Sequence, residues 1–213
     1  MDIVKNTSDF RPESFRPMDI DKDFIIGERI GTQNDWAVRK NIVLKNVYTN
    51  MDNLIEQAKN SGISLATLKP KVFDFVWQET SREWDKKKLD AVQTHQLQGN
   101  LFQDETEKLF QVVKKLPYEF SYIFETEDGK KRKLMIEDWE LGQLYWNCLK
   151  SAKGDEEVAC QKVKEKYFTE FTKTKNLYFF LGTTKRFHNI APNPFIIIGT
   201  FYPPKFSGQL SLW

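Results

Sequence analysis

The chain is poor in the residues that build metal sites and disulfide frameworks. It has two cysteines, Cys148 and Cys160, and two histidines, His95 and His188, among its 213 residues. A structural zinc site normally takes four ligands with a close Cys-x-x-Cys pair, and these cysteines lie twelve positions apart. We therefore expect no metal site. A low cysteine content also indicates a reducing compartment, so we expect a cytoplasmic protein.

Long apolar runs and phosphate-binding loops are also missing. No segment approaches the ~20 apolar residues that a membrane-spanning helix needs. Residues 1–15 lack the basic start and apolar centre of a secretory signal. Neither a Walker A sequence nor a GxGxxG motif occurs. These absences argue against a membrane partner, a nucleotide-driven enzyme and a bound cofactor.

Charge and aromatic content leave two interpretations open. The net charge is only +2, but residues 113–213 hold 16 basic and 12 acidic residues. This excess is far below that of a protein that coats DNA. Aromatic residues make up 14% of the chain, with 17 Phe. A dense aromatic core is the simpler explanation, and a surface that stacks on bases is the alternative.

Hydrophobic periodicity predicts an α+β fold with antiparallel hairpins, buried strands and a few amphipathic helices. Asn50 precedes a segment with a helical apolar face, and Gly62 is a suitable residue to end that helix. Residues 177–183 and 195–202 are nearly continuous apolar runs, which predicts strands buried on both faces. Further strands are expected at 23–30, 38–48, 71–77, 118–125 and 131–136, and further helices at 137–150 and after Asp155.

Composition divides the chain into four parts. Residues 1–85 form an N-terminal αβ region with an irregular, proline-containing lead-in, and residues 113–204 form a C-terminal αβ region. Between them, residues 86–112 are rich in Gln, Lys and Asp and indicate a linker or an exposed excursion. Residues 205–213 follow a Pro-Pro pair, and we expect them to form a flexible tail.

The tail ends in the most specific motif of the chain, Gln209, Leu210, Ser211, Leu212 and Trp213. It resembles the peptide by which bacterial replication and repair proteins dock on the β sliding clamp. That peptide favours Gln, Leu, Ser or Asp, Leu and then an aromatic residue, usually Phe. All five positions fit, with Trp213 in place of Phe. The related archaeal and eukaryotic peptide has two adjacent aromatics, so the resemblance implies a bacterial or phage setting.

The implied contacts are chemically reasonable. The amide of Gln209 supplies both donors and an acceptor. Leu212 and Trp213 would fill a groove, each contributing roughly 1.5–3 kcal/mol if fully buried. Ordering a flexible tail opposes this gain, so we expect a micromolar dissociation constant, about −8 kcal/mol. The alternative is an edge strand or a packed tail, because Leu210 and Leu212 share a face at period two.

An acidic group surrounds the predicted hairpin at 118–136 and the helix that follows it. Magnesium-dependent nucleases hold their metal with two or three carboxylates and a nearby Lys. Glu137 and Asp138 are the candidate catalytic carboxylates, with Lys133 on the strand between the acids. The Glu-x-Lys motif of one nuclease class is absent from this strand. Turn chemistry and favourable acidic residues at a helix N-terminus explain the same residues.

Two basic groups are candidates for contacts with nucleic acid. Residues 130–133 read Lys-Lys-Arg-Lys after the predicted turn. Strand alternation places them on opposite faces, so we select Lys131 and Lys133, which share one face. Lys185 and Arg186 lie between two predicted core strands, where loops often carry function. A solvated hairpin tip and an ordinary surface loop are the alternatives.

His188 follows the second basic group and is a candidate general acid or base. No nucleophile is identifiable beside it, because both cysteines fall on predicted helices. Together these patterns predict a replication or repair protein that docks on the sliding clamp and binds or processes DNA. The alternatives are a clamp-tethered nuclease, which would need Mg²⁺, and a mobile-element interaction protein without enzymatic activity.

Overall fold

The structure is a computed structural model of the 213-residue chain. It describes residues 2–19, 25–86, 89–90 and 113–205. The chain forms two compact units. Unit 1 contains residues 1–76 and 120–213, and unit 2 contains residues 77–119.

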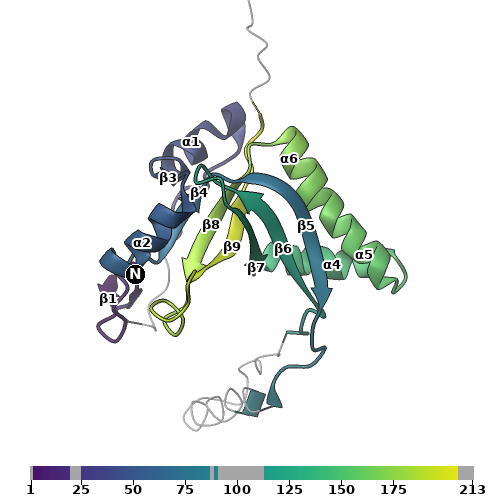
Figure 1. The fold of residues 1–213 in the computed structure, drawn as a ribbon, viewed down its shortest axis with the longest axis horizontal. Coiled ribbons are helices and arrows are strands. Elements are labelled where there is room, and N and C mark those ends of the chain that lie inside the picture. The colour runs from purple at the N-terminus through teal and green to yellow at the C-terminus, as the bar shows by residue number, and fades with distance from the viewer. Residues whose placement is uncertain (1, 20–24, 87–88, 91–112, 206–213) are drawn as a thin grey trace, which may run out of the picture. The chain divides into compact units, whose positions relative to one another are not determined.

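A mixed seven-stranded sheet organises the fold. Its strands are β3 (Val47–Tyr48), β4 (Leu65–Leu68), β5 (Lys71–Glu79), β6 (Tyr118–Glu125), β7 (Lys131–Ile136), β8 (Tyr178–Thr183) and β9 (Phe195–Phe201). They are arranged in the order β3-β4-β8-β9-β7-β6-β5 (Figure 1). β3 and β4 are parallel, as are β7 and β9, whereas β4–β8, β8–β9 and β6–β7 are antiparallel. Strands from both predicted αβ regions therefore belong to one sheet.

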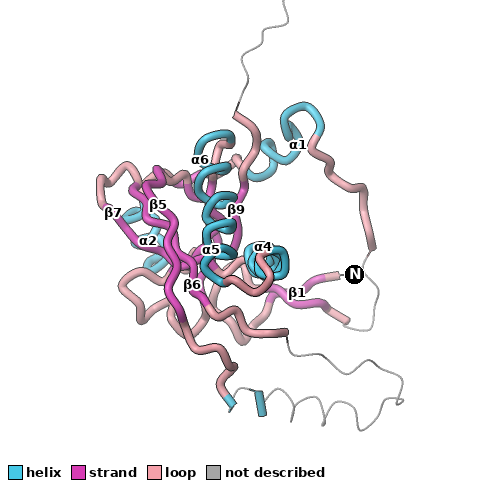
Figure 2. The backbone as a smooth tube through the Cα atoms, turned by 90° about the vertical axis from the view of Figure 1, so that its right-hand side faces the viewer, coloured by secondary structure: helices cyan, strands magenta, loops and turns pink. Residues whose placement is uncertain are grey.

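Helices accompany this sheet, and the predicted α+β class is confirmed. They are α1 (Gln33–Val43), α2 (Met51–Ser61), α4 (Trp139–Ser151), α5 (Glu156–Lys164), the π-helix η2 (Glu165–Glu170) and α6 (Phe171–Thr174). Figure 1 shows α5 and α6 along one side of the sheet, with α1 and α2 at the end formed by β3 and β4. Figure 2 shows α4 nearly end-on beside α5.

Side-chain caps begin α2, α4 and α5, and those of α2 and α5 are the residues that the sequence predicts. The Asn50 side chain accepts a hydrogen bond of 3.0 Å from the Asn53 N–H, and Gly62 ends α2 in the left-handed region with φ 73°. Asp138 and Asp155 cap α4 and α5 in the same way. Met51, Leu54 and Ala58 on the apolar face of α2 are completely buried. Burial of such a face supplies most of the stability of a short helix.

The core between the sheet and α4–α6 is aromatic, as the composition predicts. Phe75 packs edge-on against Tyr122 with a centroid distance of 4.7 Å, and it stacks on Phe120 at 5.7 Å. The Tyr122 hydroxyl donates a 2.7 Å hydrogen bond to the Tyr167 carbonyl in η2. Aromatic packing of this kind adds to the free energy of burial and fixes the sheet against the helices.

The strand predicted at 38–48 is wrong over most of its length. Residues up to Val43 lie in α1, and only Val47 and Tyr48 form a strand. The β-branched residues that suggested a strand include Val38 and Ile42, whose spacing of four also fits one face of a helix. The Arg39 guanidinium donates to the Ile30 carbonyl at 2.8 Å and ties α1 to the preceding segment.

The strand predicted at 23–30 is also wrong in its described part, residues 25–30, which has no regular structure. Ile25 and Ile26 are 87% and 93% exposed. β-branched residues favour a strand only where a partner strand and a surface to pack on exist. At the start of the chain the sequence predicts an irregular lead-in, but regular structure is found there. Strands β1 (Ile3–Lys5) and β2 (Phe15–Pro17) form a small antiparallel sheet.

The prediction that both faces of the last two strands are buried needs correction. Phe195 and Ile197 are buried on one face of β9, but Ile198 on the other is 42% exposed. Phe180 on the neighbouring strand β8 is only half-buried. An apolar run therefore marks strands with one fully packed face and one partly open face.

Unit 2 is described in part. The Thr80 N–H donates to the Pro117 carbonyl at 2.9 Å, and the Trp84 indole N–H donates to the Val113 carbonyl at 2.7 Å. Most of the linker or excursion predicted at 86–112 lies outside the described residues.

Candidate nucleic-acid interface

Strand β7 separates the basic run at 130–133 onto its two faces. Lys131 and Lys133 are exposed, whereas Arg132 alternates with them and points to the same face as buried Leu134 and Ile136. The antiparallel pairing with β6 fixes this arrangement, because Lys131 lies opposite Glu125. The predicted pair Lys131 and Lys133 thus shares one open face of the hairpin.

Strand β5 adds an aromatic ring to this surface. Phe73 is 41% exposed, and the Lys131 ammonium lies 5.4 Å from its ring centroid. The Lys71 ammonium lies 5.2 Å from the same centroid and donates to the Glu125 carboxylate at 3.0 Å. Lys71, Phe73, Lys131 and Lys133, with Glu125 between them, form what we call the basic aromatic face.

A break in strand alternation places Phe73 on the outside. Phe75, two residues further on, is completely buried, although regular alternation would put both rings on one face. The Asp74 carboxylate accepts from the Phe75 N–H at 2.8 Å and from the Lys164 ammonium of α5 at 2.6 Å. Of these two rings, Phe75 therefore packs in the core and Phe73 is left on the surface.

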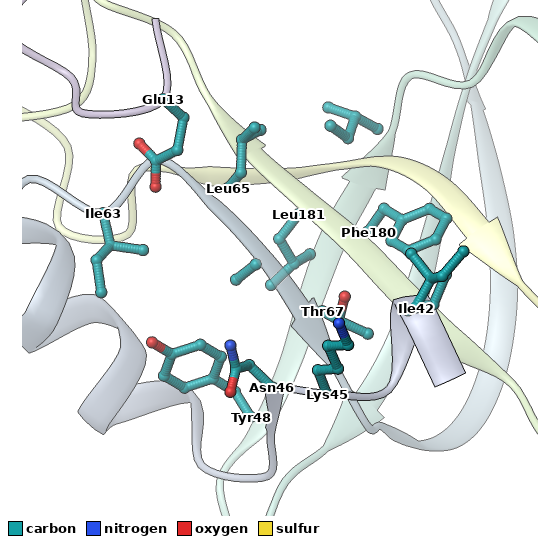
Figure 3. Close-up of a pocket in the computed structure, with 13 residues that line it drawn as sticks. Glu13, Ile42, Lys45, Asn46, Tyr48, Ile63, Leu65, Thr67, Phe180 and Leu181 are labelled. Atoms are coloured by element: carbon teal, nitrogen blue, oxygen red, sulfur yellow. The ribbon is translucent and has the colours of Figure 1, made fainter. Parts of the chain in front are cut away.

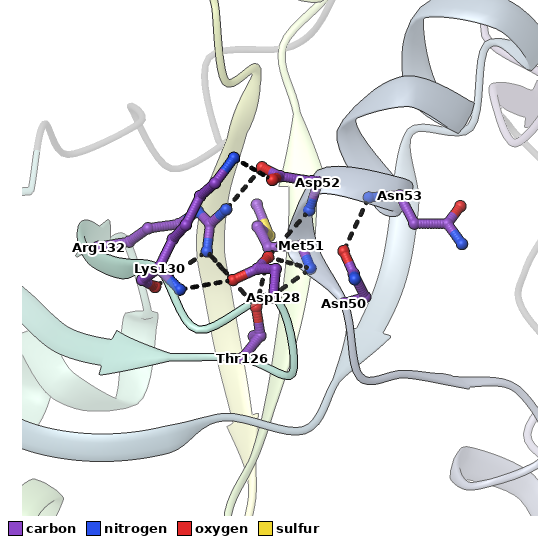
Figure 4. A network of polar contacts seen from close by, with 8 residues as sticks. All are labelled: Asn50, Met51, Asp52, Asn53, Thr126, Asp128, Lys130 and Arg132. Carbon is purple, nitrogen blue, oxygen red and sulfur yellow. Dashed lines mark hydrogen bonds and ion pairs between the residues drawn. The ribbon is translucent and has the colours of Figure 1, made fainter.

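The remaining basic residues of the hairpin make internal ion pairs (Figure 4). The Arg132 guanidinium donates to Asp128 at 2.7 Å and to Asp52 at 2.6 Å, and the Lys130 ammonium also pairs with Asp52. Arg132 is 14% exposed and Asp128 is 6% exposed, so this pair is shielded from solvent. We conclude that Arg132 and Lys130 hold the hairpin to α2.

Asp128 is the centre of this network. Its carboxylate accepts from the Met51 and Asp52 N–H groups at 3.2 Å each and from the Thr126 hydroxyl at 2.9 Å. Burial raises the pKa of this carboxyl, but the hydrogen bonds from Arg132 and from backbone N–H groups outweigh that effect and hold its pKa well below the usual range. A carboxylate at the first turn of α2 also complements the helix dipole.

His188 is completely buried and contributes to packing. Its Nε2 lies 2.9 Å from the Ala58 carbonyl and its Nδ1 lies 2.8 Å from the Thr183 hydroxyl. A carbonyl oxygen only accepts, so Nε2 carries the proton in this arrangement. The Phe10 ring packs edge-on against the imidazole at 5.1 Å. Both ring nitrogens are used within the fold, which leaves neither open to a substrate.

The loop around His188 presents a second set of basic and aromatic side chains. Lys185 and Arg186 are exposed, Phe187 is 49% exposed, and the Arg186 guanidinium lies 5.2 Å from the Phe187 centroid. The Lys185 ammonium donates to the Ser8 carbonyl of the N-terminal segment. We refer to residues 184–190 as the basic loop.

The candidate catalytic carboxylates lie at the start of α4. Asp138 is its N-cap and accepts from the Glu140 N–H at 2.9 Å, and the Tyr167 hydroxyl donates to it at 3.2 Å. Glu137 is exposed. Within the described ranges, no three His, Cys, Asp or Glu side chains are grouped so as to hold a metal ion. The arrangement is that of a capped helix.

Both cysteines are free thiols on helices. Cys160 is completely buried in α5, and burial together with Glu157 and Glu156 raises the pKa of its thiol to about 12. Burial also raises the pKa of the Cys148 thiol. Because the thiolate is the reactive form, neither cysteine suits nucleophilic catalysis.

An apolar groove of about 630 Å³ opens where the partly exposed face of β8 and β9 meets β4 (Figure 3). Phe180, Ile198 and Leu65 line it from the sheet, and Ile42 lines it from α1. Glu13 lies at one end in Figure 3. The half-open outer face of β8 and β9 therefore forms one wall of this groove.

The predicted clamp-binding residues Gln209, Leu210, Leu212 and Trp213 lie outside the described residues. The chain is described as far as Lys205, whose ammonium donates to the carbonyls of Thr172 and Lys173 at 2.8 and 2.7 Å. No helix in the described part of the chain is long and apolar enough to span a bilayer.

Comparison with family models assigns the chain to a family. The model described as Domain of unknown function (DUF8757) matches residues 47–213, and the chain belongs to this family. The match includes every strand of the seven-stranded sheet and the terminal motif. Searches of curated proteins and of solved structures found no match.

Proposed function

We propose that this member of the DUF8757 family is a DNA-binding accessory protein of bacterial replication or repair, docked on the sliding clamp through its terminal motif. The observation that carries the proposal is that motif, Gln209-Leu210-Ser211-Leu212-Trp213, in which every position has the residue type of clamp-binding peptides. The clamp works in the bacterial cytoplasm, and two free thiols are compatible with that reducing compartment.

The DNA-binding part of the proposal is supported by the basic aromatic face. Lys131 and Lys133 are exposed and free to meet phosphates, whereas Arg132 is held by two carboxylates. Lysine contacts to the sugar-phosphate backbone are independent of sequence. That property suits a protein that must act wherever the clamp is loaded. Lys185 and Arg186 of the basic loop are proposed as additional phosphate contacts.

Binding of the full chain to purified bacterial sliding clamp tests the docking. We expect a micromolar dissociation constant, about −8 kcal/mol, and loss of binding for a chain truncated after Gly208. Gln209→Ala should weaken binding because the amide anchor is removed. Trp213→Phe is the matched control, because it installs the commoner aromatic residue and should preserve affinity.

Docking through the motif is contradicted if the intact and truncated chains bind the clamp equally, or if neither binds. Gln209 to Trp213 would then be an edge strand or a packed tail, as the period-two spacing of Leu210 and Leu212 allows. The DNA-binding part would stand or fall on separate measurements.

No contact in the described residues favours the clamp-tethered nuclease over this proposal. Asp138 is engaged as a helix cap, and His188 is engaged on both ring nitrogens. Cleavage of DNA by the full chain with Mg²⁺, lost on Glu137→Ala, would nevertheless establish the enzyme. A chain that needs its tail for clamp binding and ignores DNA would instead indicate a mobile-element interaction protein.

A further inference from the structure

We infer that the basic aromatic face takes single-stranded DNA, with the Phe73 ring stacked on a base and Lys131 and Lys133 at the phosphates. This inference deepens the DNA-binding part of the proposed function and rests on it. Phe73 and Lys71 are not among the site residues that sequence patterns identify.

The ring of Phe73 has the placement that base stacking needs. It is 41% exposed on a strand of a seven-stranded sheet, while the core is filled by Phe75 from the same strand. An aromatic side chain on a sheet surface stacks on any unpaired base, because every base presents a π face. Bases within a duplex are stacked on one another and do not offer that face.

The lysines lie where the phosphates of one strand would pass. The ammoniums of Lys71 and Lys131 come from two different strands and approach the Phe73 centroid to 5.2 and 5.4 Å. Lys133 lies two residues beyond Lys131 on the same face, about 7 Å along β7. A base stacked on the ring would therefore bring its backbone close to lysine ammoniums from two strands.

The charge on this face is too small for binding by electrostatics alone. Glu125 neutralises Lys71 through their 3.0 Å ion pair, which leaves the equivalent of two free lysines. Two phosphate contacts predict a slope of log affinity against log salt of only about −1.4 for a single strand. Contacts that do not depend on charge must supply the remaining binding free energy. Stacking on Phe73 is the contact of that kind on this face.

The test uses fluorescence anisotropy of the full chain with a labelled oligodeoxythymidine and with a duplex of equal length. We expect the single strand to bind at least about tenfold more tightly than the duplex. Phe73→Leu, which keeps an apolar side chain but loses the ring face, should weaken single-strand binding about tenfold. Phe73→Trp should restore the affinity, because it provides a larger ring.

Phe15→Leu is the matched control, because it makes the same change outside both basic surfaces. Phe15 is exposed to a similar degree, at 54%, and also lies beside a cation, since the Lys5 ammonium is 5.5 Å from its ring centroid. It should leave single-strand affinity within about twofold of the original chain. Because Phe73 is exposed, its variants should fold, and a thermal unfolding scan checks this for each.

Two outcomes overturn the inference and separate it from the proposed function. Equal affinity for single strand and duplex, unchanged in Phe73→Leu, would refute stacking while leaving DNA binding in place. Absence of binding to both DNAs would overturn the inference together with the DNA-binding part of the proposed function. Clamp docking is measured separately and depends on neither result.

Discussion

The basic aromatic face and the basic loop carry the same kinds of side chain on different supports. Phe73 and its lysines stand on strands β5 and β7 of the sheet, whereas Phe187 and Arg186 lie on a turn between β8 and β9. The first is backed by the ion pairs of Arg132, and the second is backed by buried His188. In both places a polar residue with little or no exposure, Arg132 or His188, holds the structure, and its sequence neighbours are exposed.

Residues of one type that follow one another in the sequence need not share a role. Lys131 and Lys133 point outward, and Arg132 between them is an internal ion-pair residue. Likewise Arg186 is exposed while His188, two residues later, is completely buried. Substitutions at the supports should therefore change stability, and substitutions at the exposed residues should change binding.

The largest expected effect on stability is at His188. His188→Ala removes the hydrogen bonds to the Ala58 carbonyl and the Thr183 hydroxyl and leaves a cavity. We expect a loss of about 3 kcal/mol in the free energy of unfolding, measured by urea denaturation. Arg186→Ala is the control and should change stability by less than about 0.5 kcal/mol. A stable His188→Ala chain would mean that the imidazole does not support the basic loop.

Arg132 should show a somewhat smaller effect. Arg132→Ala leaves the Asp128 carboxylate without its guanidinium partner, but Asp52, which is 45% exposed, is solvated. We expect a loss of about 2 kcal/mol in urea denaturation. Lys133→Ala, one residue away and exposed, should change stability by less than about 0.5 kcal/mol. Equal effects at the two positions would contradict the division of the strand into a structural and an open face.

The Asp128 network also predicts a dependence of stability on pH. The pKa of Asp128 is held below its unfolded value by Arg132 and backbone N–H groups, against the raising effect of burial. Its contribution is therefore fully present above the unfolded pKa, about 4, and is lost as pH falls below it. Unfolding free energies between pH 7 and pH 3 should decline less steeply in Asp128→Asn. If the unfolding free energies of the original chain and of Asp128→Asn fall equally with pH, Asp128 does not contribute to the pH dependence of stability.

The sequence predicted most elements of the fold because local signals mark them. Asn50 and Gly62 bound α2, and the turn at 127–129 with Gly129 in the left-handed region, φ 70°, closes the β6–β7 hairpin. The error at residues 38–48 falls where an isolated pattern fits two structures. Val38 and Ile42 satisfy a helix face as well as a β-branched run, and only the tertiary context decides between them.

The residues of the basic aromatic face were predicted only in part, again because local patterns do not specify contacts between distant segments. Alternation alone indicates that Lys131 and Lys133 share a face, because the period of a strand is two. It cannot indicate that Phe73 joins them, since that depends on which strands are neighbours and on the break in alternation before Phe75. The pairing of Arg132 with Asp52, eighty residues away, likewise has no local signal.

The most direct test of the account compares salt-dependent DNA binding of two double variants of the full chain. Lys131→Ala with Lys133→Ala should lower single-strand affinity and reduce the slope of log affinity against log salt by about 1.4. Lys185→Ala with Arg186→Ala should have a smaller effect, because the Lys185 ammonium already donates to the Ser8 carbonyl. The opposite ranking, or no change in either variant, would contradict the assignment of DNA binding to the basic aromatic face.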